Sequence, residues 1–228
     1  MATPSHLVRV HCQDADATER LGEILGETVV PPCVIALEGD LGAGKTCLVR
    51  GLARGLGLDD RAVSSPTFVM HVEHLPVGGS GTALSHLDAY RLADLEELES
   101  IGFEELVADE DRLVAVEWAS RIATTLPEGR IDLRIDIRGA DVRAVTVLDG
   151  RSDEAQRARL RDAFEARAET FCMKIDDART CPTCETTIEE TDHRPFCSKR
   201  CRLVDLEGWF GGQYTISRPL DASDLLDD

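Results

Sequence analysis

The sequence predicts an α/β fold with a mainly parallel sheet and an antiparallel hairpin at the sheet edge, followed by a small module built on four cysteines. Three observations carry this prediction. A continuous apolar run at residues 33–39 is followed by a glycine-rich loop and then by a helical pattern. Residues 130–149 hold two segments that alternate apolar and polar side chains around a turn. Two cysteine pairs with short internal spacing lie between residues 181 and 201. We therefore expect two structural units.

Length and charge limit the class of protein. A chain of 228 residues is long enough for one ordinary domain and a small module. Its apolar runs are shorter than the ~18 residues of a membrane-spanning helix, and residues 1–11 lack the basic and apolar regions of a secretory signal. We therefore expect a cytoplasmic protein, with no membrane partner, whose eight cysteines stay reduced. The formal net charge of −18 opposes direct adhesion to nucleic acid, so any such partner is expected to be reached through another protein.

The first elements alternate strand and helix. Residues 7–10 have the pattern of a short edge strand, and Asp14 or Asp16 is suited to cap a helix over residues 17–29. Residues 33–39 are apolar on both faces, which indicates a strand buried within a parallel sheet. After the loop, a second helical pattern places its apolar residues on one face and ends at a glycine.

The later elements complete the sheet. Strands are expected at residues 84–90 and 113–118, on either side of a helix that starts near Asp94. The two alternating segments within residues 130–149 are expected to form the antiparallel hairpin at the sheet edge. Residues 152–174 are rich in alternating charges and poor in apolar side chains, which indicates a solvated helix that links two units.

The loop after the buried strand carries a phosphate-binding motif. The segment "GDLGAGKT", residues 39–46, fits G-x-x-x-x-G-K-S/T and lies between a strand and a helix, as the chemistry requires. Glycines allow backbone N–H groups to surround a phosphate, and the helix N-terminus adds positive potential. Lys45 supplies a cation for the terminal phosphates, and the Thr46 hydroxyl supplies a ligand for magnesium. The sequence therefore predicts a P-loop NTPase fold. The loop residues expected to contact the nucleotide are Gly39, Asp40, Leu41, Gly42, Ala43, Gly44, Lys45 and Thr46.

Two acidic residues at strand ends are candidates for the chemistry at the phosphates. The chain contains no asparagine, so it lacks the Asn-Lys-x-Asp element with which GTP-binding proteins read guanine, and we expect ATP. Asp88 is assigned to magnesium, directly or through water, and Glu117 to orienting or activating the attacking water beside that ion. With Thr46 these two acids form the expected magnesium set. Carboxylates that merely cap the next element are the alternative for both. No glutamine lies near these strands, so hydrolysis is expected to be slow until a partner completes the site.

Four blocks of sequence resemble the TsaE family, the ATPase subunits of the bacterial machinery that makes threonylcarbamoyladenosine in tRNA. They are "GDLGAGKT", "SSPTF" at 64–68, "HLDAYRLADLEELESIGFEEL" at 86–106 and "VEWASRI" at 116–122. The resemblance spans roughly residues 7–150. It implies a P-loop fold and ATP hydrolysis that supports turnover of a complex with the TsaB and TsaD proteins, with tRNA engaged only through that complex.

The resemblance also implies roles for particular residues. It places Thr67 in a nucleotide-responsive loop with Ser65 and Pro66, Asp88 beside magnesium, and Glu117 with Trp118 in a functional Glu-Trp pair next to the nucleotide. One departure is Cys47, which stands where the family commonly has a second threonine in contact with the nucleotide. This cysteine is expected either to alter the α-phosphate contact or to create an oxidisable thiol in the site.

The cysteines near the C-terminal end predict a zinc site. Two residues separate Cys181 from Cys184, twelve separate Cys184 from Cys197, and three separate Cys197 from Cys201. Two close thiolate pairs joined by a loop suit tetrahedral zinc. A C-x-x-C redox pair is the alternative, but it would not require the second pair. So short a module has too little apolar surface to fold without the metal.

This module resembles the YacG family of small zinc proteins that inhibit DNA gyrase. The resemblance covers roughly residues 179–217 and lies in the cysteines, in "RPFCSKRC" and in Trp209. It makes DNA gyrase a candidate partner. The basic residues around the second cysteine pair are suited either to dock an acidic protein surface or to balance the zinc thiolates. The predicted layout is a TsaE-like ATPase domain at residues 1–150, a charged helical linker at 151–178, the zinc module at 179–218 and an acidic tail at 219–228.

Two other classes of function stay open at the level of sequence. In one, the loop only senses ATP and the zinc module acts on a DNA-processing enzyme. In the other, the chain is a small-molecule kinase, because P-loop proteins of this size often are. The lysine, the threonine and the two strand-end acids favour catalysis over sensing. Stimulation by protein partners rather than by a small molecule would distinguish the ATPase from the kinase.

Overall fold

The computed structural model describes residues 6–65, 70–92, 94–169 and 174–177, together with six residues of the C-terminal module. These six are Cys181, Thr186, Cys197, Ser198, Arg200 and Cys201. The chain divides into two compact units, residues 1–178 and 179–228. Thr67 and Cys184, which the sequence predicts to be functional, lie outside the described residues. None of the described helices is long and apolar enough to cross a membrane.

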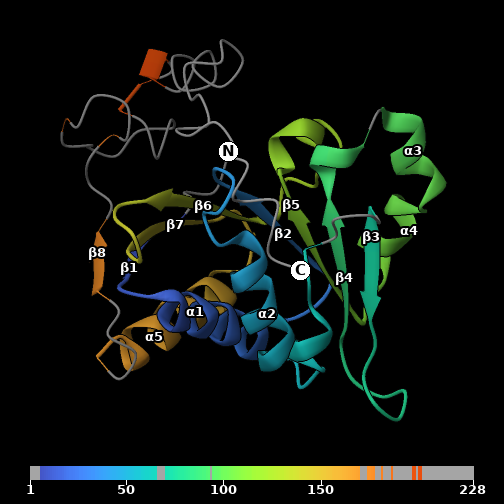
Figure 1. Ribbon diagram of the computed structural model, residues 1–228, viewed down its shortest axis with the longest axis horizontal. Helices are drawn as coiled ribbons and strands as arrows, with labels where there is room; N and C mark the ends of the chain where they lie inside the picture. Colours follow the sequence, from blue (N-terminus) through green and yellow to red (C-terminus); the bar gives the residue numbers. More distant parts are fainter. Residues whose placement is uncertain are drawn as a thin grey trace, which may run out of the picture. The chain divides into compact units, whose positions relative to one another are not determined.

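An eight-stranded sheet in the order β3-β4-β5-β2-β6-β7-β1-β8 organises the first unit (Figure 1). The central strands β4, β5, β2 and β6 run parallel, and the remaining strands pair antiparallel with their neighbours. The predicted α/β class with parallel central strands is therefore confirmed. The strands are β1 (His6–Cys12), β2 (Cys33–Glu38), β3 (His71–His74), β4 (Ala83–Asp88), β5 (Arg112–Glu117), β6 (Ile131–Ile137), β7 (Arg143–Asp149) and β8 (Lys174–Asp177).

The antiparallel half of the sheet is larger than the sequence predicts. The expected hairpin is present as β6 and β7, which pair from Ile131 with Asp149 to Ile137 with Arg143. Strands β1 and β8 continue the sheet beyond β7, so the hairpin lies inside this half and not at its outer edge. Strand β1 is likewise not an edge strand, because β8 pairs with it on its other side.

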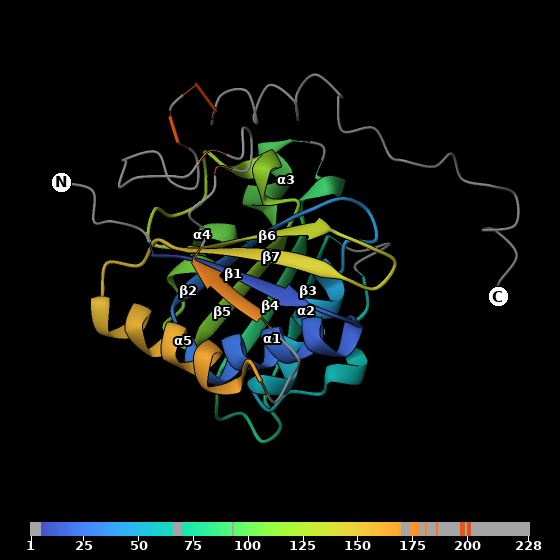
Figure 2. The same ribbon diagram turned by 90° about the vertical axis from the view of Figure 1, so that its left-hand side faces the viewer.

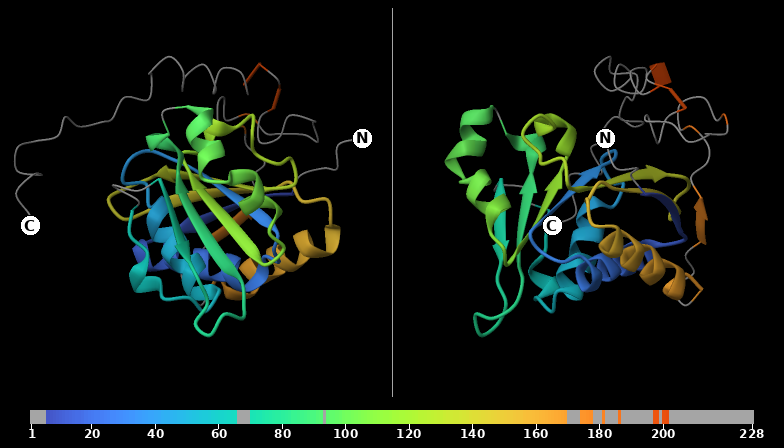
Figure 3. Two further views of the ribbon diagram at one scale, coloured as in Figure 1. Left: turned by 90° about the vertical axis from the view of Figure 1, so that its right-hand side faces the viewer. Right: turned by 180° about the vertical axis from the view of Figure 1, so that it is seen from behind.

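Helices cover both faces of the sheet and create two apolar cores. Helices α1, α2 and α5 lie over one face and α3 and α4 over the other (Figures 1 and 3). Alternate residues of β2 enter the two cores, with Ile35 and Leu37 on the α1/α2 side and Val34 and Ala36 on the α3/α4 side. The helices are α1 (Ala15–Thr28), α2 (Lys45–Gly55), α3 (Leu95–Ser100), α4 (Phe103–Ala108) and α5 (Glu154–Arg167), with short 3-10 helices η1 (Asp60–Ala62), η2 (Ala89–Arg91) and η3 (Ala119–Ile122).

Helices α1 and α2 pack backbone against backbone through glycines. A methyl group on Gly51 of α2 would lie 1.7 Å from the carbonyl oxygen of Glu19, and one on Gly22 of α1 would lie 2.0 Å from that of Leu48. Only residues without a Cβ permit this approach. Asp14 caps α1 by accepting a hydrogen bond from the Ala17 N–H at 2.7 Å. The close contact fixes the position of α2, whose first residues belong to the phosphate-binding motif.

The helix expected near Asp94 is divided into two short helices. Asp94 caps α3 by accepting a hydrogen bond from the Glu97 N–H at 3.0 Å. Gly102 then adopts a φ of +69° between α3 and α4, a conformation that interrupts the helix and that side chains rarely tolerate. Leu98 of α3 and Phe103 of α4 are buried on the same face of the sheet.

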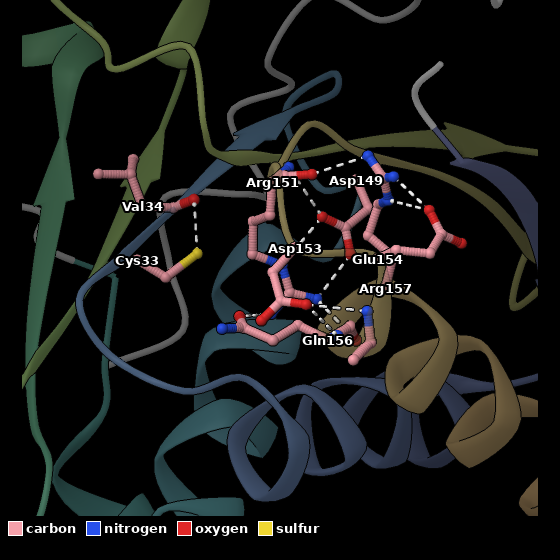
Figure 4. Close-up of polar contacts among 9 residues, drawn as sticks. Cys33, Val34, Asp149, Arg151, Asp153, Glu154, Gln156 and Arg157 are labelled. Carbon is pink, nitrogen blue, oxygen red and sulfur yellow. Dashed lines mark hydrogen bonds and ion pairs between the residues drawn. The ribbon is translucent and has the colours of Figure 1, made fainter. Parts of the chain in front are cut away.

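Helix α5 is present as predicted, but it is not a solvated linker. Helix α5 lies beside α1 (Figure 2). Its Leu160 and Phe164 are 2% and 1% exposed and join the apolar core that also contains residues of α1. The segment before the helix is anchored by Arg151, whose guanidinium donates to both carboxylate oxygens of Asp149, at 2.9 and 2.6 Å (Figure 4). Arg157 of the helix donates to the Arg151 carbonyl at 2.8 Å. These buried contacts make α5 part of the first unit.

Candidate functional site

The carboxyl ends of three parallel strands meet the glycine-rich loop. Strand β5 lies between β2 and β4, with Glu117 paired to Leu37 on one side and to Asp88 on the other. Gly42 and Gly44 of the loop adopt φ values of +75° and +104°, as the motif requires. Among the described residues, no side chain caps the first N–H groups of α2 after Gly44. These N–H groups are therefore suited to bind an anion such as a phosphate group.

Lys45 is the first residue of α2, directly after this loop, and its side chain is buried. Its side-chain ammonium donates to the carbonyl oxygens of Gly39 at 2.7 Å and Asp40 at 3.0 Å. The same Nζ lies 3.8 Å from the centroid of the Trp118 ring, a cation–π contact. Burial lowers the pKa of Lys45 below its usual value, and the neighbouring carboxylates, Glu117 foremost, oppose that shift. The cation is thus desolvated and held by dipoles and a ring rather than by a direct ion pair in the described part of the chain.

Thr46 and Glu117 are brought into direct contact. The Thr46 hydroxyl donates to Oε1 of Glu117 at 2.8 Å, linking the start of α2 to the end of β5. Nε2 of His86, on β4, lies 2.9 Å from the same oxygen. His86 and Glu117 are 0% and 3% exposed, so this carboxylate is almost completely removed from solvent. The predicted magnesium residues Thr46 and Glu117 therefore share one local site.

Asp88 lies beside Glu117 at the end of the neighbouring strand. Its Oδ1 accepts a hydrogen bond from the Tyr90 N–H at 3.0 Å, and its Oδ2 lies 3.6 Å from Nε of Arg91. Asp88 thus also caps the following turn, as the alternative interpretation predicts. Burial raises the pKa of Asp88, and the nearby charge of Glu117 raises it further. Two acids that repel each other, next to a threonine hydroxyl, form a set of hard oxygen donors that fits Mg²⁺.

Trp118 occupies an unusual backbone conformation next to Glu117. Its φ of +57° is the left-handed region, the single positive φ of a non-glycine residue in the described part of the chain. The indole ring packs on Tyr90 with 5.1 Å between ring centroids, in addition to its contact with Lys45. A backbone conformation that costs free energy at this point is typical of a functional site.

Two charged residues at the site were not predicted from sequence. Glu38, at the end of β2, accepts a hydrogen bond from the Ser120 N–H at 2.9 Å, and burial raises its pKa. Arg143, at the start of β7, donates from Nε to the carbonyl oxygen of Ala43 at 3.0 Å and from Nη1 to carbonyls of its own turn. Glu38 could have been found from the sequence, because it is an acidic residue at the end of an apolar strand, directly before the motif. Arg143 lies 100 residues from Ala43 along the chain, so its contact with the loop could not be predicted from the sequence.

Burial of Cys47 disfavours the reactive thiolate form of its side chain. Its Sγ lies 3.4 Å from the carbonyl oxygen of Ala15 at the start of α1. Burial raises the pKa of Cys47 to about 11, and the charge of Glu19 contributes in the same direction. Because the thiolate is the reactive form, the thiol is poorly suited to oxidation at neutral pH. The raised pKa argues against the oxidisable thiol and leaves the altered α-phosphate contact as the expectation for Cys47.

Three of the four predicted zinc ligands converge in the second unit. The Sγ atoms of Cys181, Cys197 and Cys201 all lie within 4.8 Å of one another. The sulfurs of Cys197 and Cys201 are 3.5 Å apart. Tetrahedral zinc with Zn–S bonds of about 2.3 Å separates its sulfurs by roughly 3.8 Å. The spacing of these thiols fits the metal.

Comparison with known proteins gives two matches that follow one another along the chain. Residues 12–145 match the family model for the threonylcarbamoyl adenosine biosynthesis protein TsaE, and residues 179–227 match that for the DNA gyrase inhibitor YacG. The TsaE protein of Treponema pallidum is 37% identical over 140 residues, which are 61% of this chain and 99% of that protein. The TsaE protein of Streptomyces coelicolor is 43% identical over 132 residues, 56% of this chain and 86% of that protein. The crystal structure of Bacillus subtilis YdiB covers 71% of this chain and 97% of its own, with 25% identity and a TM-score of 0.54.

Proposed function

Because the chain belongs to the TsaE family of threonylcarbamoyl adenosine biosynthesis proteins and carries a YacG-type module after it, we propose that its first unit is a magnesium-dependent ATPase of that tRNA modification. The observation that carries this proposal is the hydrogen bond of 2.8 Å from Thr46 to Glu117. It joins the hydroxyl of the phosphate-binding motif to a buried carboxylate at the end of a parallel strand, the two kinds of group that hold magnesium in P-loop NTPases.

Each residue of the site has a separate role in this proposal. The N–H groups at the start of α2 and the ammonium of Lys45 bind the phosphates. Thr46, Asp88 and Glu117 would hold magnesium, directly or through water, and the ion would offset the negative charge of the phosphate oxygens. Glu117 orients or activates the attacking water. The buried position of Glu117, 3% exposed, supports this role because an ordered carboxylate out of bulk water is preorganised for such a task.

We further propose that hydrolysis supports turnover of a complex with TsaB and TsaD. The family match supports these partners, and the net charge of −18 supports engagement of tRNA through the complex rather than by this chain directly. In this proposal the threonylcarbamoyl group is transferred by the partners. A kinase would instead form ADP in response to a small-molecule acceptor, with no need for proteins.

Two variants test the assignment of binding and hydrolysis separately. Lys45→Ala is expected to weaken binding of a fluorescent ATP analogue, because it removes the loop's cation. Glu117→Gln is expected to keep binding and to lose hydrolysis by about two orders of magnitude or more. Glu73→Gln, at an acid 44% exposed on β3, is the matched control and is expected to retain both. Hydrolysis by Glu117→Gln at the wild-type rate would contradict the proposal.

For the second unit we propose a structural zinc site formed by Cys181, Cys184, Cys197 and Cys201, and contact with DNA gyrase. The converging thiols and the YacG match support the two parts of this proposal, respectively. Metal analysis of the purified chain is expected to find one zinc per chain, which Cys197→Ser loses and Cys47→Ser keeps. Retention of full zinc content by Cys197→Ser would refute the site. A supercoiling assay with and without the zinc-loaded chain tests the gyrase contact.

A further inference from the structure

We propose that His86 positions the carboxylate of Glu117 for hydrolysis by donating a hydrogen bond from Nε2. This inference rests on the proposed function of the first unit. Nε2 of His86 lies 2.9 Å from Oε1 of Glu117, and both side chains are buried. His86 does not reach the phosphate loop in any described contact. It is therefore a positioning residue, which acts through Glu117.

The sheet register places the two residues together. Strands β4 and β5 run parallel, with His86 opposite Ala115 and Asp88 opposite Glu117. Because side chains alternate along a strand, these four residues lie on one face, the face that α2 covers. His86 and Glu117 are thus diagonal neighbours, a distance that a long side chain can span. The contact follows from the backbone and does not depend on a flexible loop.

The chemistry of the contact determines the tautomer of His86. Oε1 of Glu117 already accepts the hydrogen bond of Thr46, and we assign it as the acceptor of a second bond from Nε2 of His86. Nδ1 of His86 is buried and has no hydrogen-bond partner among the residues that the structure describes. A proton on Nδ1 would be a buried donor without an acceptor among the described residues, whereas a proton on Nε2 has Glu117 as its acceptor.

Two donors acting on one oxygen restrict how the carboxylate can rotate. Thr46 donates to Oε1 of Glu117 from α2, and in the proposed tautomer His86 donates to the same oxygen from β4. Neither bond uses Oε2, which is the oxygen left for a water molecule. Without His86, the carboxylate keeps one donor and is buried with less compensation. The expected defect is in the chemical step, because the loop and Lys45 are untouched.

A neighbouring histidine provides a matched control. His74, on β3, is 6% exposed, and its ring centroid lies 6.5 Å from that of His86. No described hydrogen bond links His74 to Glu117. Replacing His74 therefore tests the loss of a buried imidazole at almost the same place in the sheet, without the contact that the proposal requires.

Amide side chains separate positioning from simple packing. The amide of His86→Gln reaches about as far as Nε2 and can still donate to Glu117, whereas that of His86→Asn reaches only about as far as Nδ1. We expect His86→Asn to lower kcat for ATP by about 10- to 100-fold, the usual effect of losing a group that orients an active-site ligand. Binding of a non-hydrolysable ATP analogue is expected to stay unchanged. His86→Gln is expected to recover most of kcat, and His74→Asn to resemble the wild type. Equal kcat for His86→Asn and the wild type, or equal losses for His86→Asn and His86→Gln, would overturn the proposal.

A spectroscopic measurement tests the contact without activity. In the ¹⁵N NMR spectrum of the labelled, nucleotide-free chain, Nε2 of His86 is expected to show a protonated shift and Nδ1 an unprotonated one, with both changed by Glu117→Gln. The opposite tautomer would overturn the proposal. The tautomer is measured on the wild-type chain, so this test does not depend on whether a variant folds. If the wild type hydrolyses no ATP with or without TsaB and TsaD while the tautomer is as expected, the proposed function fails and the His86–Glu117 contact stands.

Discussion

Replacing Gly51 by alanine should separate helices α1 and α2 and destabilise the first unit. The new methyl group would lie 1.7 Å from the carbonyl oxygen of Glu19 and 2.6 Å from its carbon. To reach an ordinary contact, the two backbones must move apart by roughly 1.7 Å, which loosens the reciprocal contact at Gly22 as well. Overpacking typically costs about 1–3 kcal/mol, and a rigid backbone neighbour places this site at or above the upper end. The better helix propensity of alanine returns about 1 kcal/mol.

The net cost expected for Gly51→Ala is about 2–3 kcal/mol of unfolding free energy. For a unit of this size it lowers the melting temperature by about 4–12 °C, measured by far-ultraviolet circular dichroism. The matched control is Gly129→Ala, where a methyl group would meet nothing within 4 Å. That variant is expected to stay within about 0.5 kcal/mol of the wild type. Equal melting temperatures of Gly51→Ala and the control would show that the close contact of Gly51 with the Glu19 carbonyl does not limit the packing of α1 and α2.

Three further predictions concern the helix, the loop and an acid. Phe164→Ala should cost about 3–5 kcal/mol in chemical denaturation because its ring is buried, whereas a cost as small as that of the adjacent Glu165→Ala would show that α5 is not part of the first unit. Arg143→Ala should weaken binding of an ATP analogue, because it removes the hydrogen bond to the Ala43 carbonyl and so loosens the peptide that carries the Gly44 N–H. The control is Arg138→Ala, at an exposed arginine. Equal affinities of the two variants for the analogue would contradict this role of Arg143. Asp88→Asn should be more stable than the wild type at neutral pH without magnesium. The folded state raises the pKa of Asp88, so the stability lost to its ionisation is regained as the pH falls toward the ordinary value of 3.8 and below. Urea denaturation across this pH range checks the convergence of the two proteins, and a constant difference would contradict it.

The sequence predicts the phosphate loop well because its determinants are local. Gly42, Gly44 and Lys45 are constrained by the turn itself, and the buried strand before them is readable from its apolar run. The two strand-end acids are found for the same reason. Their closeness, however, follows from the pairing of Asp88 with Glu117 across β4 and β5, which a pattern along one strand cannot give.

What the sequence does not predict depends on contacts between distant segments. Helix α5 has few apolar residues, yet Leu160 and Phe164 are enough to bury one face against α1. Strand β8 pairs with β1 from the other end of the first unit, and this pairing removes the expected edge. Arg143 is separated from Ala43 by a hundred residues along the chain. For α5 and Arg143 one or two side chains carry the contact, and for β8 a backbone pairing of four residues does so; none of these produces a clear periodic signal along the chain.

The most direct test of the proposed function is ATP hydrolysis by the full chain with magnesium, first alone and then with purified TsaB and TsaD. The proposed function predicts slow turnover alone, a clear increase with the two partners together, and loss of both in Glu117→Gln but not in Glu73→Gln. Unchanged turnover on adding the partners, with ATP binding intact, would contradict the proposed function. It would favour the alternative in which the loop only senses ATP.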